Sequence, residues 1–221
     1  RDRSVSRGLG DVYKRQNYKS DITRLKEVTD MPIRIFVDQG HNPFGFNAGA
    51  EGFGLREQDI TYMVGAYLAD LLAADPRFDV ATSRPNPTTV LGYNNSSSLR
   101  QRVDMANSWG ADYFISIHTN ANENPAVNGT EGYVYSLNSV AAALASSIVN
   151  EIVRRVGTKN NGVIENRVFY VLRRTNMPAV LVELAYITNY EDAMLLKDAQ
   201  YQFAYGIYVG LLNYLGLPQI F

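Results

Sequence analysis

Short apolar runs rich in β-branched residues alternate along this chain with segments of helical periodicity, and this alternation constrains the fold more than any other feature. The runs that predict strands lie at 33–38, 78–83, 112–118, 132–136, 167–172 and 179–184. The segments whose apolar spacing predicts helices lie at 56–74, 98–108, 140–156 and 203–215. The predicted strands have mainly apolar patterns and not strictly alternating ones, which is typical of a mainly parallel sheet covered on both faces. We therefore predict an α/β fold.

Polar and small residues mark the ends of several predicted helices. Ser98, followed three residues later by Gln101, predicts a capping box at the start of the helix at 98–108. Gly157 stands in the position that glycine favours just after a helix. Asn189 predicts the N-cap of a further short helix, with Asp192 three residues on.

The chain divides into a short polar segment and one long globular segment. Residues 1–30 are polar and lack apolar periodicity, so we expect a flexible or non-native lead-in there. No break in composition divides 31–221, which we interpret as one domain.

Composition excludes several classes of protein. The chain of 221 residues has no cysteine, which excludes disulfide scaffolds, thiolate zinc sites and cysteine nucleophiles. Its 21 basic and 22 acidic residues give a formal charge of −1, so we expect no nucleic-acid partner. No apolar run approaches the ~18 residues that span a membrane, and no signal peptide is visible.

Chemically reactive side chains collect where predicted strands end, which is where open α/β sheets bind ligands. His41 follows the first strand and His118 ends the third, and these are the only histidines of the chain. Glu183 ends the last apolar run, where an unpartnered charge is costly. Glu57 lies in a first helical turn, where it can also simply complement the helix dipole. Two imidazoles and a carboxylate match a catalytic zinc site, and a second carboxylate can serve as general base.

Other catalytic motifs fit the chain poorly. It has neither an HExxH helix motif nor a GxSxG turn, and its glycines match neither GxGxxG nor a P-loop. Arg173 and Arg174 follow a predicted strand and form either a solvated surface pair or a contact to an anionic substrate. We select Arg173 and Asn120 as candidate substrate contacts.

Over 33–215 the chain resembles the zinc-dependent N-acetylmuramoyl-L-alanine amidases of the bacterial cell-wall amidase type. The resemblance is carried by IRIFVDQGHNP, GLREQDIT, LRQRVDMANSWGADYFISIHTNAN, GTEGYVY and FYVLRRTNMPAVLVELAYITNYEDAMLL. It implies a three-layer αβα fold with a twisted, mostly parallel sheet. By position, it also implies one catalytic zinc ion held by His41, Glu57 and His118, with Glu183 as the catalytic glutamate.

The same resemblance implies a function. It implies hydrolysis of the amide between N-acetylmuramic acid and L-alanine in peptidoglycan, by a catalytic domain at 31–221. The expected place of action is therefore the cell wall or periplasm, and we expect a monomer. Three alternatives remain: a zinc peptidase that cuts within stem peptides, a non-catalytic peptidoglycan-binding module, and a plain structural α/β domain.

The chain departs from the family pattern at positions that are not ligands. Gln39 replaces a usual Pro or Ala, Asn42-Pro43 replaces a common Gly-Gly, and Ala185-Tyr186 replaces Gly-Phe. Some family members carry a long insert with a regulatory helix that plugs the zinc, and 135–140 leaves no room for one. We therefore predict a constitutively open site.

Overall fold

A computed structural model of the chain describes residues 31–220, and the lead-in predicted at 1–30 lies outside them. Six strands form one sheet in the order β4-β1-β5-β8-β6-β7. They are β1 (Ile33–Gln39), β4 (Phe78–Thr82), β5 (Tyr113–Asn120), β6 (Thr130–Val134), β7 (Asn160–Glu165) and β8 (Ala179–Tyr186). Strand β5 is parallel to both β1 and β8, β6 is parallel to β7, and β6 is antiparallel to β8. The predicted mostly parallel sheet is confirmed.

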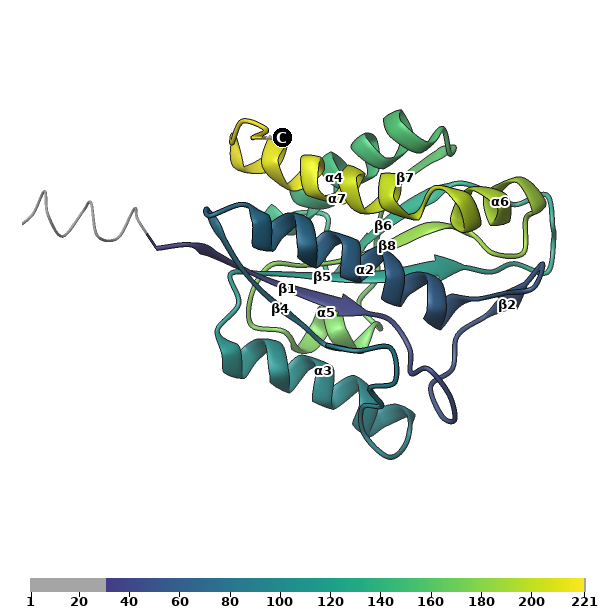
Figure 1. Cartoon of the computed structure of the whole chain (residues 1–221), viewed down its shortest axis with the longest axis horizontal. Coiled ribbons are helices and arrows are strands. Elements are labelled where there is room, and N and C mark those ends of the chain that lie inside the picture. Colours follow the sequence, from purple (N-terminus) through teal and green to yellow (C-terminus); the bar gives the residue numbers. More distant parts are fainter. Residues whose placement is uncertain (1–30, 221) are drawn as a thin grey trace, which may run out of the picture. The chain divides into compact units, whose positions relative to one another are not determined.

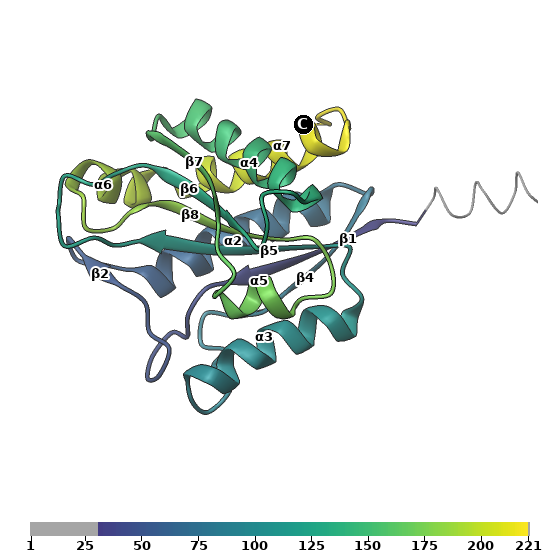
Figure 2. The ribbon, with the colours of Figure 1, turned by 180° about the vertical axis from the view of Figure 1, so that it is seen from behind.

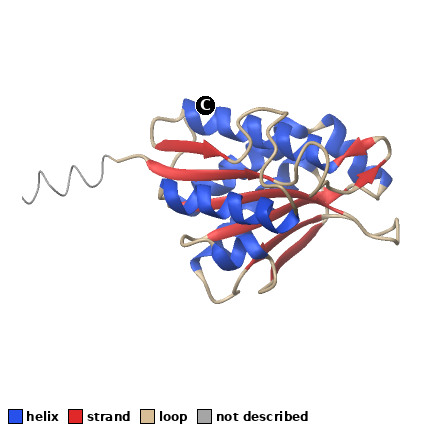
Figure 3. Cartoon of the chain, turned by 90° about the horizontal axis from the view of Figure 1, so that it is seen from below, coloured by secondary structure: helices blue, strands red, loops and turns tan. Residues whose placement is uncertain are grey.

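Helices cover both faces of this sheet (Figure 1). The helices on one face are α2 (Glu57–Ala74), α4 (Val140–Val156), α6 (Tyr190–Asp198) and α7 (Gln200–Leu215). The other face carries α3 (Asn95–Trp109) and the short α5 (Tyr170–Arg174), which lie side by side in the front and rear views (Figure 2). Figure 1 shows the strands between these two helical layers, and Figure 3 shows the same strands and helices from below. The expected three-layer αβα architecture is therefore confirmed.

Two helix ends agree with the sequence. Helix α4 ends at Gly157, whose φ of 87° is the left-handed conformation that glycine adopts easily. The side chain of Asn189 accepts a hydrogen bond from the backbone nitrogen of Asp192 at the start of α6.

The predicted capping box at Ser98 and Gln101 is wrong. Helix α3 begins earlier, because Asn94 and Ser97 form the reciprocal side-chain and backbone contacts of the box. Ser98 is buried within the helix, and its hydroxyl accepts from the side chain of Asn47. The side chain of Gln101 instead accepts from the backbone nitrogen of Gly92.

The strand predicted at 167–172 is also wrong. Those residues form a turn followed by α5, because the side chain of Asn166 accepts from the backbone nitrogens of Val168 and Phe169. The apolar residues Val171 and Leu172 are buried although they belong to a helix. An apolar run this short is compatible with either a buried helix or a buried strand. Strand β7 was not predicted because its sequence, NNGVIE, is mostly polar.

A small hairpin was also missed by the sequence analysis. It consists of β2 (Glu51–Gly52) and β3 (Leu55–Arg56), which pair antiparallel just before α2. No helix among residues 31–220 is long and apolar enough to cross a membrane.

Asp75, which ends α2, joins that helix to α7. Its carboxylate accepts hydrogen bonds from Arg77 Nη2 at 2.6 Å and from the Tyr208 hydroxyl at 2.8 Å. Burial alone would raise the pKa of Asp75, but the hydrogen bonds from Arg77 and Tyr208 outweigh it and lower the pKa.

We expect Asp75→Asn to lower the free energy of unfolding at neutral pH by about 1.5–3 kcal/mol, the range for hydrogen bonds to a charged group. Because the folded-state pKa is depressed, this contribution is present above the unfolded pKa and is lost as the pH falls through the folded pKa. Urea unfolding of both proteins from pH 7 downwards measures it. A difference between them that does not shrink below about pH 4 contradicts the assignment.

Candidate metal centre

Three neighbouring strands bring the predicted site residues to one edge of the sheet. Strands β1, β5 and β8 are parallel, so their carboxyl ends meet there. His41 lies two residues beyond the end of β1, His118 lies near the end of β5, and Glu183 is directly opposite His118 in β8. Glu57 opens α2 and approaches from the helical layer.

His41, Glu57 and His118 converge on one point. Glu57 Oε1 lies 3.1 Å from His41 Nε2 and 3.0 Å from His118 Nδ1. One ligand atom from each residue lies within 4.8 Å of the other two. With bonds of ~2.0–2.2 Å, the ligand atoms of a tetrahedral zinc site lie about 3.3–3.6 Å apart. The close approach of the three ligand atoms and their two-nitrogen, one-oxygen donor set therefore fit a metal site.

Hydrogen bonds orient the three side chains. His41 Nδ1 lies 3.2 Å from the carbonyl oxygen of Asn47, and this contact orients the ring so that Nε2 faces Glu57. Glu57 accepts from the backbone nitrogens of Thr119 at 3.0 Å and Ala50 at 2.9 Å. Burial would raise the pKa of Glu57, but the hydrogen bonds from His118 and His41 lower it below its usual range. Glu57 is therefore ionised, as a ligand must be.

Two glycines allow the close approach of these groups, and the sequence analysis missed both. A Cβ at Gly40 would lie 2.5 Å from His118 Cε1 and 2.7 Å from the carbonyl oxygen of Ile117. A Cβ at Gly49 would lie 2.6 Å from Glu57 Oε2. A side chain at either position would displace a member of the triad.

Glu183 faces the same pocket as the two histidines. The pocket has a volume of about 240 Å³, and its remaining wall is largely apolar, from α3, α5 and β8. Glu183 Oε2 is buried and has no hydrogen-bond partner among the described residues. Burial raises the pKa of Glu183 well above its usual range, and the negative charges of Glu57 and Glu131 add to this effect. A carboxylate with a raised pKa binds a proton more readily than an exposed one, so Glu183 can accept a proton inside the pocket.

Glu131 is a second buried carboxylate that the sequence analysis missed. It is the antiparallel partner of Glu183 in β6. Its oxygens accept from the hydroxyls of Tyr186 at 2.6 Å and Tyr133 at 2.7 Å. The only signal for it in the sequence is a charged residue directly before the apolar run GYVY.

The two candidate substrate contacts lie in different surroundings. The half-buried Asn120 donates from Nδ2 to Glu131 at 3.0 Å, and its Oδ1 accepts from the backbone of Ala121. Arg173 lies in the last turn of α5, is exposed, and is not among the residues that line the pocket. The structure therefore places Asn120 beside the Glu183 strand and Arg173 at the surface.

The sequence matches a family model described as N-acetylmuramoyl-L-alanine amidase over residues 35–213. The chain is 37% identical to the N-acetylmuramoyl-L-alanine amidase LytC of Bacillus subtilis over 184 residues, which cover 81% of this chain and 35% of that protein. It is 35% identical to the amidase CwlM of Bacillus licheniformis over 170 residues, covering 76% of this chain and 62% of that protein. The chain thus spans about a third of LytC and about three-fifths of CwlM.

Solved structures of amidases also resemble this chain. An N-acetylmuramoyl-L-alanine amidase from Clostridium difficile 630 superposes with a TM-score of 0.74 at 31% identity. The match covers 84% of this chain and 97% of that one. The catalytic domain of CwlV from Paenibacillus polymyxa also gives a TM-score of 0.74, at 29% identity, covering 84% of this chain and 99% of that one.

Proposed function

The chain belongs to the N-acetylmuramoyl-L-alanine amidase family, and on that premise we propose that it hydrolyses the amide between N-acetylmuramic acid and L-alanine in peptidoglycan. The observation that supports this most is the convergence of His41, Glu57 and His118 on one point with Glu183 opposite. All four side chains come from one chain, which supports a monomer as the active form. Its substrate places its action outside the cytoplasm, and we assign the catalytic domain to 31–221.

We propose zinc as the metal, with His41, Glu57 and His118 as its ligands. Imidazole nitrogens combined with one carboxylate suit zinc, whereas magnesium and calcium prefer oxygen ligands alone. When bound, zinc would act as a Lewis acid on the scissile amide carbonyl and on a water molecule.

Glu183 supplies the proton transfers that amide hydrolysis requires. Its Oε2 accepts a proton from the attacking water as the water oxygen bonds to the amide carbon. It then passes that proton to the alanine nitrogen as the carbon–nitrogen bond breaks. The second transfer is necessary because an unprotonated amine is a poor leaving group.

We keep Asn120 and Arg173 as proposed substrate contacts. Asn120 retains one amide hydrogen beyond its bond to Glu131, which it can donate to a substrate carbonyl. Arg173 carries an exposed guanidinium that can bind a carboxylate of a stem peptide. The segment between β6 and α4 runs only over 135–139, which supports a site without a plugging helix.

Digestion of purified cell walls tests the function. Mass spectrometry should find glycan strands whose muramic acid lacks peptide, together with released peptides that begin at L-alanine. Fragments cut within the stem peptide would instead identify a zinc peptidase. Binding to walls without release of fragments would identify a binding module.

Removal of the metal should lower the melting temperature of the protein. A ligand present at 100 times its Kd stabilises the folded state by about 2.7 kcal/mol, and chelation removes that contribution. Differential scanning fluorimetry after treatment with a chelator, followed by added zinc, measures the loss and its recovery. Magnesium is the control and should restore neither the melting temperature nor the activity. A melting temperature that does not change when zinc is removed or added contradicts the proposed ligand set.

A further inference from the structure

The backbone of His41 adopts an unusual conformation. Its φ of 67° lies in the left-handed region, which residues other than glycine rarely occupy. This conformation turns the chain after β1, so that the imidazole faces Glu57 while the carbonyl group of His41 faces the body of the protein. Contacts from the surrounding structure must stabilise it, because such a conformation persists only where neighbours determine it.

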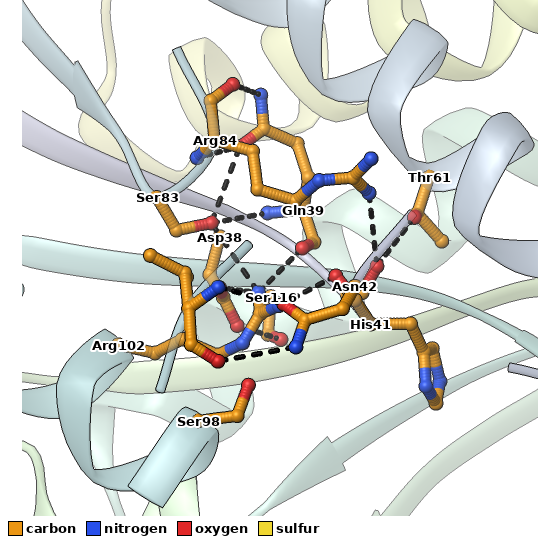
Figure 4. Close-up of polar contacts among 12 residues, drawn as sticks. Asp38, Gln39, His41, Asn42, Thr61, Ser83, Arg84, Ser98, Arg102 and Ser116 are labelled. Carbon is orange, nitrogen blue, oxygen red and sulfur yellow. Dashed lines mark hydrogen bonds and ion pairs between the residues drawn. The ribbon is translucent and has the colours of Figure 1, made fainter. Parts of the chain in front are cut away.

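Arg102 makes those contacts from α3 (Figure 4). Its side chain is 1% exposed, and its Nη2 donates to the carbonyl oxygen of His41 at 2.5 Å. Its Nη1 donates to the carbonyl oxygen of Gln39, also at 2.5 Å. One planar guanidinium therefore holds the last residue of β1 and the first metal ligand together.

A buried carboxylate fixes the guanidinium in turn. Asp38 Oδ1 lies 2.6 Å from Arg102 Nη1, and Asp38 Oδ2 accepts from the hydroxyl of Ser116 at 2.7 Å. Arg84, the other buried arginine of this cluster, reaches the carbonyl oxygens of Gly40 and Gln58. Arg84 therefore does not replace the contact between Arg102 and the carbonyl oxygen of His41.

We propose that Arg102 is a positioning residue for the metal centre, which holds the His41 backbone in its left-handed conformation so that Nε2 faces Glu57 before a metal binds. This inference rests on the proposed metal site and on nothing about the substrate. It extends the site to a residue outside the three proposed ligands, whose planar guanidinium can donate to two carbonyl oxygens at once.

Zinc binding to Arg102 variants, measured by competition with a chromophoric chelator, tests the proposal. Arg102→Met should raise the Kd for zinc about 10–100-fold, the range for loss of a group that orients a ligand. Arg102→Lys keeps the charge beside Asp38 but cannot fork across two carbonyls, so its Kd should fall between those of Met and wild type. The absorption spectrum of the cobalt-substituted protein should change in the same order.

Arg77→Met is the matched control. Arg77 also pairs with a buried carboxylate, that of Asp75, which keeps a hydroxyl partner in Tyr208 just as Asp38 keeps Ser116. The control therefore also loses an ion pair to a buried carboxylate, but one outside the metal centre and with a more exposed arginine. It should unfold more easily than wild type yet bind zinc with the wild-type Kd.

Hydrogen exchange of the metal-free protein provides a readout without metal. The backbone nitrogen of Asn42 donates to the carbonyl oxygen of Asn47 at 2.9 Å, within the loop that carries His41. Its amide should exchange faster in Arg102→Lys than in wild type or in Arg77→Met.

The proposal is overturned if Arg102→Lys and Arg102→Met bind zinc as wild type does, or if Arg77→Met weakens zinc binding equally. If Arg102→Met fails to fold, the Kd for zinc and the Asn42 exchange rate of Arg102→Lys decide whether the proposal holds. Failure of the proposed function is a separate result, since wild-type protein that binds zinc tightly but leaves walls intact contradicts the function alone. A wild-type chain that takes up no zinc contradicts both.

Discussion

Replacing Glu183 by glutamine should slow the release of peptides from purified walls about 10²–10⁴-fold, the range for loss of a general acid–base group. Glutamine has the shape of glutamate but accepts no proton at neutral pH. It can therefore neither take a proton from the attacking water nor pass one to the alanine nitrogen. The affinity for zinc should stay at the wild-type value, because the three proposed ligands lie on other segments of the chain. Loss of turnover with metal retained is the result that identifies a proton-transfer residue.

The rate of appearance of new L-alanine amino groups measures this effect, with zinc content determined on the same samples. Glu165→Gln is the control, since it makes the same chemical change at a carboxylate paired with the exposed Arg167. It should release peptides at the wild-type rate. Release at that rate by Glu183→Gln would show that the proton-transfer role belongs to another group.

The parts of the fold that carry the site could be predicted from the sequence. Strands β1, β5 and β8 are largely buried, so each appears as a mainly apolar run with chemically reactive residues at or after its carboxyl end. This pattern alone predicts that His41, His118 and Glu183 lie at one edge of the sheet. The resemblance to a known family was needed to distinguish Glu57 from a residue that only complements a helix dipole.

Other elements could not be predicted, because tertiary contacts decide them. The run at 167–172 has strand composition, but the Asn166 side chain turns the chain there and the core accepts Val171 and Leu172 from a helix. Strand β7 has little apolar pattern and forms because β6 offers it a free edge.

The residues that position the metal centre could not be predicted from the sequence for the same reason. Glu131 and Arg102 each act on residues that lie far away along the chain, Arg102 reaching back 61 residues to His41. Nothing local distinguishes Arg102 from Arg100 and Asp104 of the same helix, and the only local sign of Glu131 is its place directly before an apolar run. In the sequence Gly40 likewise resembles an ordinary turn residue, and only the structure shows that it packs against His118.

Gly40→Ala should therefore impair metal binding through a single methyl group. The new Cβ would lie 2.5 Å from His118 Cε1 and 2.7 Å from the carbonyl oxygen of Ile117. The backbone cannot retreat freely, because the nitrogen of Gly40 donates to that same carbonyl at 3.0 Å. His118 must move instead, and we expect the Kd for zinc to rise by more than about 100-fold, beyond the effect of losing an outer contact.

Gly210→Ala separates this effect from crowding in general. A Cβ at Gly210 would lie 2.5 Å from Ile148 Cα, where α7 packs on α4, so the steric conflict is similar but lies at a helix–helix contact. Both variants should lose about 1–3 kcal/mol of unfolding free energy, the usual cost of an overpacked core. Only Gly40→Ala should lose zinc affinity and wall hydrolysis together. If both variants bind zinc like wild type, His118 does not need the position that glycine allows it, and its assignment as a ligand fails.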